Sequence, residues 1–182
     1  MNHQSTGTLR LAQGAVIAAA YVVLTWLSAL ANLAYGPVQF RISEALTILP
    51  VFTSAAVPGL AIGCLLSNIL SGYGIYDMVF GTLATLLAAL LTRAARNVRP
   101  HGVPVLSAVP PVVLNAFIVG FEITVVNNGT LDSAWMQHFN QPLFWSNAAS
   151  VGLGELVVCF ALGLPLAVMI FKHKRLKLLI EG

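Results

Sequence analysis

The fold of this chain is decided by residues 11–33, which read LAQGAVIAAAYVVLTWLSALANL. This run has no charged side chain and is long enough for a helix to cross the hydrocarbon core of a bilayer, which takes about 20 residues. Ala29 and Ala31 imitate a signal-peptide cleavage site, but the run is longer than a usual signal core and further apolar runs follow. We therefore expect a retained first membrane helix.

The composition also indicates a membrane domain. Hydrophobic residues make up 58% of the 182 residues and charged residues only 8%, whereas soluble domains are about 25% charged. A soluble protein this apolar would expose patches that promote association. We expect an all-α integral membrane protein with a single domain, residues 1–182.

The remaining apolar runs suggest about six transmembrane helices in all. Pro50, Pro58 and a polar stretch at 71–77 interrupt the region from 45 to 93, so two of its helices are short. The predicted helices are 11–33, 44–54, 56–70, 78–93, 103–126 and 147–171.

The basic residues predict the topology. Eight of the nine Lys and Arg flank apolar segments: Arg10, Arg93, Arg96, Arg99, Lys172, Lys174, Arg175 and Lys177. With six helices, all of these lie on the side of the two termini, which the positive-inside rule makes cytoplasmic. The net charge of +3 therefore reflects membrane orientation and not nucleic-acid binding.

Two carboxylates lie inside the predicted spans, where no basic side chain is available to pair with them. Glu122 is in the outer part of helix 103–126, and Glu155 lies about 12 Å along helix 147–171 at 1.5 Å per residue. Ionisable groups within spans are costly and usually face a cavity or a partner. Asn147 precedes Glu155 by two helical turns and shares its face. We expect an outward-facing polar pocket, to which Asn68 and Asn115 add amides.

Arg41, Glu44 and Asp77 lie at the outer ends of helices 44–54 and 78–93. With Tyr73, they could line the mouth of the pocket. Alternatively, Glu44 pairs with Arg41 three residues earlier, and Asp77 is the N-cap of its helix. The sequence leaves these alternatives open.

The predicted outer loop at 127–146 is long and polar, and it contains aromatic residues such as Phe139 and Trp145. Long loops over a membrane domain often act as lids or binding elements. Alternatively, these aromatic residues form a belt at the headgroup level. Because aromatic faces stack on planar rings, Trp145 is a candidate ligand contact. Carboxylates, amides and aromatic rings together favour a planar, nitrogen-rich heterocycle as ligand.

The sequence contains no phosphate-binding loop, no H-E-x-x-H metal motif and no G-x-S-x-G motif. We therefore expect no enzyme activity, no metal and no cofactor in this chain. Cys64 and Cys159 lack a metal-ligand spacing and are expected only to pack. A transporter of this size needs an energy source, such as a partner. Ala15 and Ala19 form a small-residue face on the first helix that lets another helix approach closely, although internal packing explains them equally simply.

Three segments resemble the QueT family. They are YGPVQFRISEALTILP at 35–50, PGLAIGCLLSN at 58–68 and FGTLATLLAA at 80–89, of which 38–50 is the most specific. Members of that family are substrate-binding membrane subunits, or S components, of energy-coupling-factor (ECF) transporters.

The resemblance implies a six-helix S-component bundle in the bacterial inner (plasma) membrane that binds a queuosine precursor, a 7-deazaguanine base. It also implies partners: a transmembrane coupling subunit that docks on Ala15 and Ala19, and two cytoplasmic ATPases that hydrolyse ATP. S components topple in the membrane to deliver their ligand. Glu122 and Glu155 would accept hydrogen bonds from the base, and Asn115 and Asn147 would contact its carbonyl.

Three other functions stay open. The chain could be an S component for another small, vitamin-like metabolite. It could be a solitary gradient-driven carrier, or a small intramembrane enzyme that uses Glu122 and Glu155 as acid and base.

Overall fold

The computed structural model describes residues 3–35, 39–69, 71, 73–128, 137, 139 and 141–181, and the regular structure in these ranges is entirely helical. The longer helices are α1 (His3–Leu30), α2 (Ala56–Asn68), α3 (Ile75–Ala94), α4 (Val109–Asn128) and α5 (Pro142–Val158). A 3₁₀ helix, η1 (Ile42–Val51), lies between α1 and α2. Short 3₁₀ turns η2 (Ala95–Asn97), η3 (Pro100–Gly102) and η4 (Val105–Ala108) connect α3 to α4.

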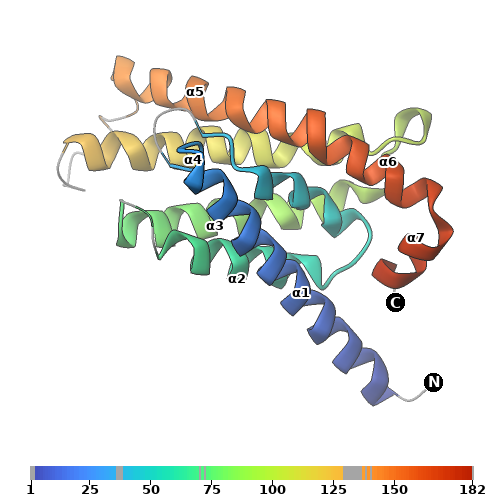
Figure 1. Cartoon of the computed structure of the whole chain (residues 1–182). Coiled ribbons are helices and arrows are strands. Elements are labelled where there is room, and N and C mark those ends of the chain that lie inside the picture. Colours follow the sequence, from blue (N-terminus) through green and yellow to red (C-terminus); the bar gives the residue numbers. More distant parts are fainter. Residues whose placement is uncertain are drawn as a thin grey trace.

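The helices form one bundle in which neighbours in sequence pack side by side, α1 on α2, α2 on α3, α3 on α4 and α4 on α5. The segment η1 lies in the middle and touches α1, α2, α3 and α5 (Figure 1). Both chain ends lie at the same end of the bundle (Figure 1). The basic residues meet there, since the Arg99 guanidinium stacks over the Phe171 ring with 4.7 Å between the guanidinium carbon and the ring centroid.

The helix predicted at 44–54 is present as the 3₁₀ helix η1, which begins at Ile42 and ends at Val51. The Thr47 hydroxyl donates to the Glu44 carbonyl at 2.5 Å, and such bonds compete with the α-helical pattern. Pro50 has no N–H to donate. A 3₁₀ run of 10 residues is unusually long and often marks a functional or strained segment.

Helices α1 and α2 pack at very short range through glycine. A Cβ atom on Gly59 would lie 2.7 Å from the carbonyl oxygen of Gly14, and one on Gly63 would lie 3.0 Å from that of Ala18. Small residues let membrane helices approach this closely. This contact fixes α1 against the rest of the bundle and so positions its polar side chains over η1.

The last long helix begins earlier than the predicted residue 147 and is not uniform. After α5 the chain passes through a π-helical turn, η6 (Cys159–Gly163), into α6 (Leu164–Lys172). A further helix, α7 (Lys174–Glu181), was not predicted and folds back to α1, where the Gln13 amide donates to the Ile180 carbonyl at 3.3 Å. The other predicted boundaries differ from the observed ones by a few residues, except that α1 begins at His3 instead of residue 11.

In the described part of the chain, four helices are long and apolar enough to cross a membrane: Gly7–Leu30, Ile75–Asn97, Val105–Asn127 and Pro142–Lys172. The apolar helices η1 and α2 are shorter, and the 13 residues of α2 extend only about 20 Å, less than a hydrocarbon core of about 30 Å. Large apolar side chains such as Leu30 and Leu11 are exposed on the outside of the bundle, as lipid contact requires. The chain is a multi-pass membrane protein.

Candidate functional site

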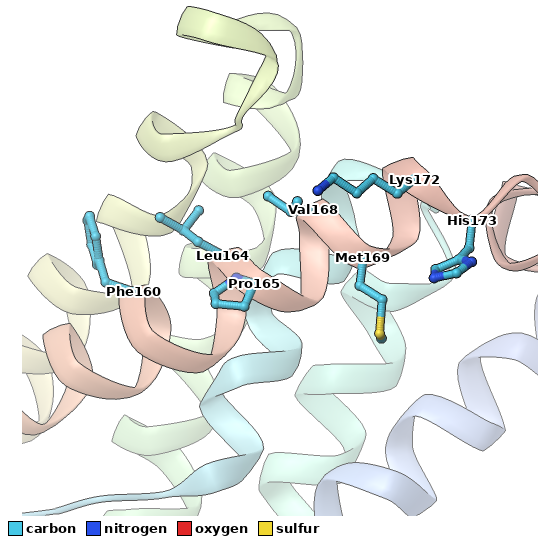
Figure 2. A pocket seen from close by; sticks show the side chains of 7 residues that line it. All are labelled: Phe160, Leu164, Pro165, Val168, Met169, Lys172 and His173. Atoms are coloured by element: carbon cyan, nitrogen blue, oxygen red, sulfur yellow. The ribbon is translucent and has the colours of Figure 1, made fainter.

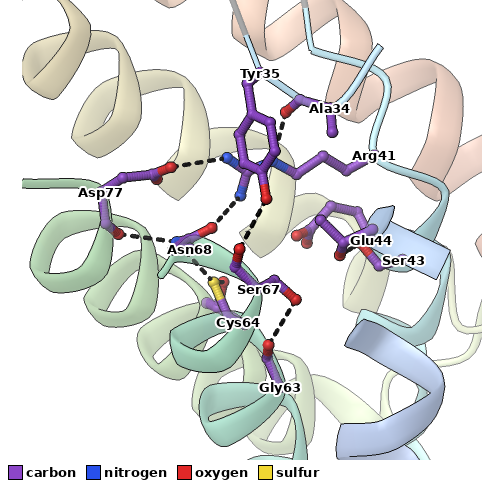
Figure 3. Close-up of polar contacts among 12 residues, drawn as sticks. Ala34, Tyr35, Arg41, Ser43, Glu44, Gly63, Cys64, Ser67, Asn68 and Asp77 are labelled. Carbon is purple, nitrogen blue, oxygen red and sulfur yellow. Dashed lines mark hydrogen bonds and ion pairs between the residues drawn. The ribbon is translucent and has the colours of Figure 1, made fainter. Parts of the chain in front are cut away.

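The centre of the site is Arg41, whose side chain is 4% exposed. Its Nε donates to the Ala34 carbonyl at 2.8 Å and its Nη1 to the Asn68 Oδ1 at 3.3 Å. Its Nη2 lies 3.5 Å from the Asp77 Oδ2, forming a buried ion pair (Figure 3). The Tyr35 ring lies over the guanidinium, 5.1 Å from its carbon atom, and its hydroxyl donates to the Ser67 carbonyl. Arg41 thereby ties the loop before η1 to α2 and α3.

Asn68 completes this contact between α2 and α3. Its Nδ2 donates to the Asp77 carbonyl at 2.9 Å and lies 3.4 Å from the Cys64 sulfur (Figure 3). Gly81 leaves room for it, because a Cβ atom there would lie only 2.6 Å from the amide nitrogen. The amide therefore has a fixed orientation, with its oxygen directed at Arg41.

The Glu44 carboxylate lies on the α1 side of η1. Tyr21 donates its hydroxyl hydrogen to Glu44 Oε1, and one turn further along α1 the Thr25 hydroxyl donates to Ser43 Oγ at 2.8 Å. The second oxygen, Glu44 Oε2, is buried without a hydrogen-bond partner. Glu44 therefore retains an acceptor directed into the protein interior.

Glu155 approaches Glu44 from α5. The Cys159 thiol lies 3.7 Å from Glu155 Oε2, and the Asn115 side chain on α4 interacts with both carboxylates. Glu44 and Glu155 are also close enough to influence one another electrostatically, so Asn115 is shared by two neighbouring acids. This part of the site offers carboxylate oxygens and one amide from three different elements.

Glu122 on α4 is the least satisfied polar side chain of the site. It is 1% exposed, and neither of its carboxylate oxygens has a hydrogen-bond partner. Asp77, Arg41 and Tyr73 are the groups that interact with it electrostatically. Burial, and then the charges of Glu122 and Asp77, raise the pKa of Tyr73, so its hydroxyl is protonated and can donate at neutral pH.

The buried carboxyl groups outnumber the buried basic side chains. Four carboxylates are at most 4% exposed, namely Glu44, Asp77, Glu122 and Glu155. Among the described residues, Arg41 is the only buried Lys or Arg side chain. A site of this composition suits a ligand that donates hydrogen bonds or carries positive charge, because an unpaired buried carboxylate is costly.

The structure decides the two alternatives that the sequence left open for Arg41, Glu44 and Asp77. The ion pair of Arg41 is with Asp77 and not with Glu44, and Asp77 is the third residue of α3, whose N-cap is Gly74. Trp145, the aromatic candidate for a ligand contact, is 57% exposed and packs on Phe117 and Phe144.

The other predicted residues lie as follows. Asn147 is buried, but its Nδ2 donates to the Thr124 hydroxyl on α4 at 3.0 Å instead of contacting Glu155. Ala15 and Ala19 are exposed on α1. Half of the predicted outer loop at 127–146 lies outside the described residues; of its aromatic side chains, Phe139 stacks on Phe121 with 4.9 Å between ring centroids.

Several polar residues of the site were not predicted. Tyr21, Thr25 and Ser28 are buried on one face of α1, and their spacing of four and three residues was the signal that could have shown it. The two cysteines were expected only to pack, but both have polar contacts: Cys64 with Thr85 at 3.3 Å and Cys159 with Thr47 at 3.8 Å. Among the described residues, no group of three His, Cys, Asp or Glu is arranged to hold a metal.

Comparisons with known proteins agree with the resemblance seen in the sequence. The sequence model of the QueT transporter family matches residues 11–172. A segment of 73 residues is 41% identical to the protein named Queuosine precursor transporter QueT from Lactococcus lactis subsp. cremoris, and covers 40% of this chain and 43% of that protein. No solved structure matches the chain. Because the family match extends through the described helices from α1 to α6, this chain belongs to the QueT transporter family.

Proposed function

We propose that the chain is the substrate-capture subunit of an ECF-type importer and binds a queuosine precursor, a 7-deazaguanine base. One observation carries this proposal: four buried carboxylates surround a single buried guanidinium, and Glu122 has no hydrogen-bond partner at all. The name of the Lactococcus relative supports the choice of substrate.

The chemistry of the base fits the acceptors. A 7-deazaguanine presents a lactam N–H, an exocyclic amine and a pyrrole N–H, all of them donors. The free oxygen of Glu44 and the carboxylate of Glu155 could accept from the base on one side, and Glu122 on the other. Asn115, which already contacts Glu44 and Glu155, would donate to the ring carbonyl. The excess of carboxylates favours an aminomethyl form, whose ammonium group would neutralise one of them.

In the described conformation the acceptors are closed off from water. Glu44, Glu122 and Glu155 are 2%, 1% and 4% exposed. Entry of a ligand therefore requires an outward movement of a covering segment, for which the residues before η1 are suited. Tyr35 and Arg41 hold them to α2 and α3 by a few polar contacts, to Ser67, Asn68 and Asp77.

The proposal includes the coupling partners. Six membrane crossings with both termini in the cytoplasm would place all the basic clusters there, as the positive-inside rule requires in a bacterial plasma membrane. A transmembrane coupling subunit would dock on the exposed Ala15 and Ala19, two cytoplasmic ATPases would hydrolyse ATP, and toppling of this chain would release the ligand inside.

A titration of the purified chain tests the substrate. Calorimetry with 7-deazaguanine, its aminomethyl form and guanine should show binding of the deazaguanines and tightest binding of the aminomethyl form. Guanine is the matched control, because it has an acceptor nitrogen where the deazaguanines have a carbon. Absence of binding to every deazaguanine would contradict the proposal, and tighter binding of a vitamin in competition would favour another S-component substrate.

Uptake measurements in cells separate the proposal from the other two functions. Loss of uptake on deletion of the partner ATPases is the expected result. Uptake that survives this deletion would indicate a solitary carrier. Conversion of the base by the purified chain alone would indicate an enzyme.

A further inference from the structure

A groove runs along η6 and α6, and none of the buried carboxylates lines it (Figure 2). Its volume is about 560 Å³. Two rows of side chains spaced by four residues border it. The first row is Phe160, Leu164, Val168 and Lys172, and the second is Pro165, Met169 and His173. Rows with this spacing form ridges on a helix surface, and an elongated apolar group fits between two of them.

The local sequence explains the shape of the groove. The π-helical turn Cys159–Gly163 widens the helix immediately before it, so that the Leu164 N–H reaches back to the Cys159 carbonyl. Pro165 follows and has no N–H to donate. Such π-turns are frequent at functional sites.

The groove has an apolar end and a basic end. It lies within the candidate membrane span Pro142–Lys172, so its apolar side chains are at the depth of lipid acyl chains. Lys172 and His173 line it where the span ends, and the Lys172 side chain extends back over Val168 (Figure 2). Lys174 and Arg175 follow in the sequence. None of the described lining residues is acidic.

We propose that this groove binds one anionic phospholipid, with an acyl chain between the two ridges and the phosphate at Lys172 and His173. The Lys172 ammonium attracts the phosphate by charge, and the flexible stem of a lysine at the end of a span lets its ammonium meet a headgroup. The His173 ring can donate an N–H to a phosphate oxygen. The proposal is independent of the substrate of the buried site.

The charge distribution favours a lipid over a transmembrane helix of a partner as the occupant. A partner helix would be apolar along its length and would leave the ammonium of Lys172 without a counter-charge at the end of the groove. An anionic lipid matches both parts at once, since it is apolar along its chain and negative at its head.

The first experiment measures lipid preference with the full-length chain in detergent. Phosphatidylglycerol, phosphatidylcholine and glycerol phosphate are added separately, and bound lipid is counted by native mass spectrometry while the melting temperature is recorded. We expect phosphatidylglycerol to be retained in preference to phosphatidylcholine and to raise the melting temperature, and glycerol phosphate to have no effect. Equal retention of the two lipids, or an equal effect of glycerol phosphate, would overturn the proposal.

Lys172→Gln tests the basic end of the groove. The preference for phosphatidylglycerol should fall about fivefold, which corresponds to about 1 kcal/mol per basic residue at an anionic surface. Arg10→Gln removes a basic residue outside the groove and should leave the preference unchanged. An equal fall in both variants would mean that only the total charge matters, and the site would be rejected.

Met169→Trp tests the apolar part, because Met169 is 45% exposed and a larger side chain there fills the groove. Retention of both lipids at this site should be lost. Leu153→Trp is the matched control, on an exposed side chain of the same span outside the groove. Unchanged lipid retention in Met169→Trp, combined with loss of co-purifying coupling subunits, would assign the groove to a protein partner instead.

Discussion

Arg41 and Asp77 form an ion pair in which the two side chains are 4% and 1% exposed and the Nη2 and Oδ2 atoms are 3.5 Å apart. They are 36 residues apart in the sequence and lie on different elements, so the pair joins the start of η1 to the start of α3. Arg41 also interacts electrostatically with Glu44 and Glu122. Among the described residues it is the only buried Lys or Arg, so the pair links two elements and also contains the cation of the proposed site.

Asp77→Asn is expected to destabilise the protein. The substitution leaves the Arg41 guanidinium buried without its counter-charge, and breaking a buried pair in this way costs about 3–5 kcal/mol. Thermal and denaturant unfolding of the purified chain in detergent measures the loss. Lys174→Gln, at an exposed basic residue, should change stability by less than about 0.5 kcal/mol.

The double variant Arg41→Met with Asp77→Leu separates charge from packing. Since well-packed apolar side chains often replace a buried ion pair without loss, it should unfold later than Asp77→Asn alone. If Asp77→Asn unfolds like the unchanged protein, the two side chains do not form a buried pair.

Glu122→Gln is expected to change stability and ligand binding in opposite directions. The buried carboxylate has no partner, and replacing it with a neutral amide lowers the desolvation penalty, so the ligand-free protein should gain about 1 kcal/mol. Affinity for the deazaguanine base should fall about 10- to 100-fold, because an amide has one acceptor oxygen where the carboxyl group has two. Unfolding without ligand and calorimetry with ligand give the two values.

Glu155→Gln is the comparison for Glu122→Gln. The Glu155 carboxylate already interacts with Cys159 and Asn115. Glu155→Gln should therefore weaken ligand binding but should not give the gain in stability expected for Glu122→Gln. A Glu122→Gln protein that binds normally and unfolds earlier would show that Glu122 is structural.

The sequence predicted the membrane helices because span length and apolar composition are local properties. It also predicted that Glu122 and Glu155 are buried, since a charge inside an apolar run has few other positions available. It did not predict the Arg41–Asp77 pair, because Glu44 is nearer to Arg41 in sequence and only the packing of η1 against α3 decides between the two acids.

The sequence also did not predict which side of each helix faces the interior of the bundle. Phe144 and Asn147 are buried while Trp145, beside them, is exposed, and a run that is apolar all round gives no preferred face. The 3₁₀ form of η1 depends in part on the Thr47 hydroxyl bond to Glu44, which residue composition does not indicate. The amphipathic helix α7 is only 8 residues long, too short for a span-based search to find.

Gly59→Ala is expected to destabilise the contact between α1 and α2. The new Cβ would lie 2.7 Å from the Gly14 carbonyl oxygen, which is backbone and cannot turn away, so the helices must separate. Overpacking of this kind costs about 1–3 kcal/mol. Gly7→Ala is the matched control on α1, where nothing lies within 4 Å of the new Cβ, and should be neutral or slightly stabilising. Equal melting temperatures for the two variants would contradict the close approach of the helices.

Ala15→Trp is expected to spare ligand binding and to block uptake. Ala15 is exposed on α1, outside the buried cluster, so a large side chain there leaves the carboxylates in place. A coupling subunit that packs closely on Ala15 and Ala19 would be held away by the indole ring. Calorimetry on the purified chain and uptake in cells measure the two effects, with co-purification of the coupling subunit as the direct readout. Leu153→Trp, on an exposed side chain of α5 and therefore outside this face of α1, is the control and should keep both binding and uptake. Loss of ligand binding in Ala15→Trp would mean that this face supports the binding site and does not dock a partner.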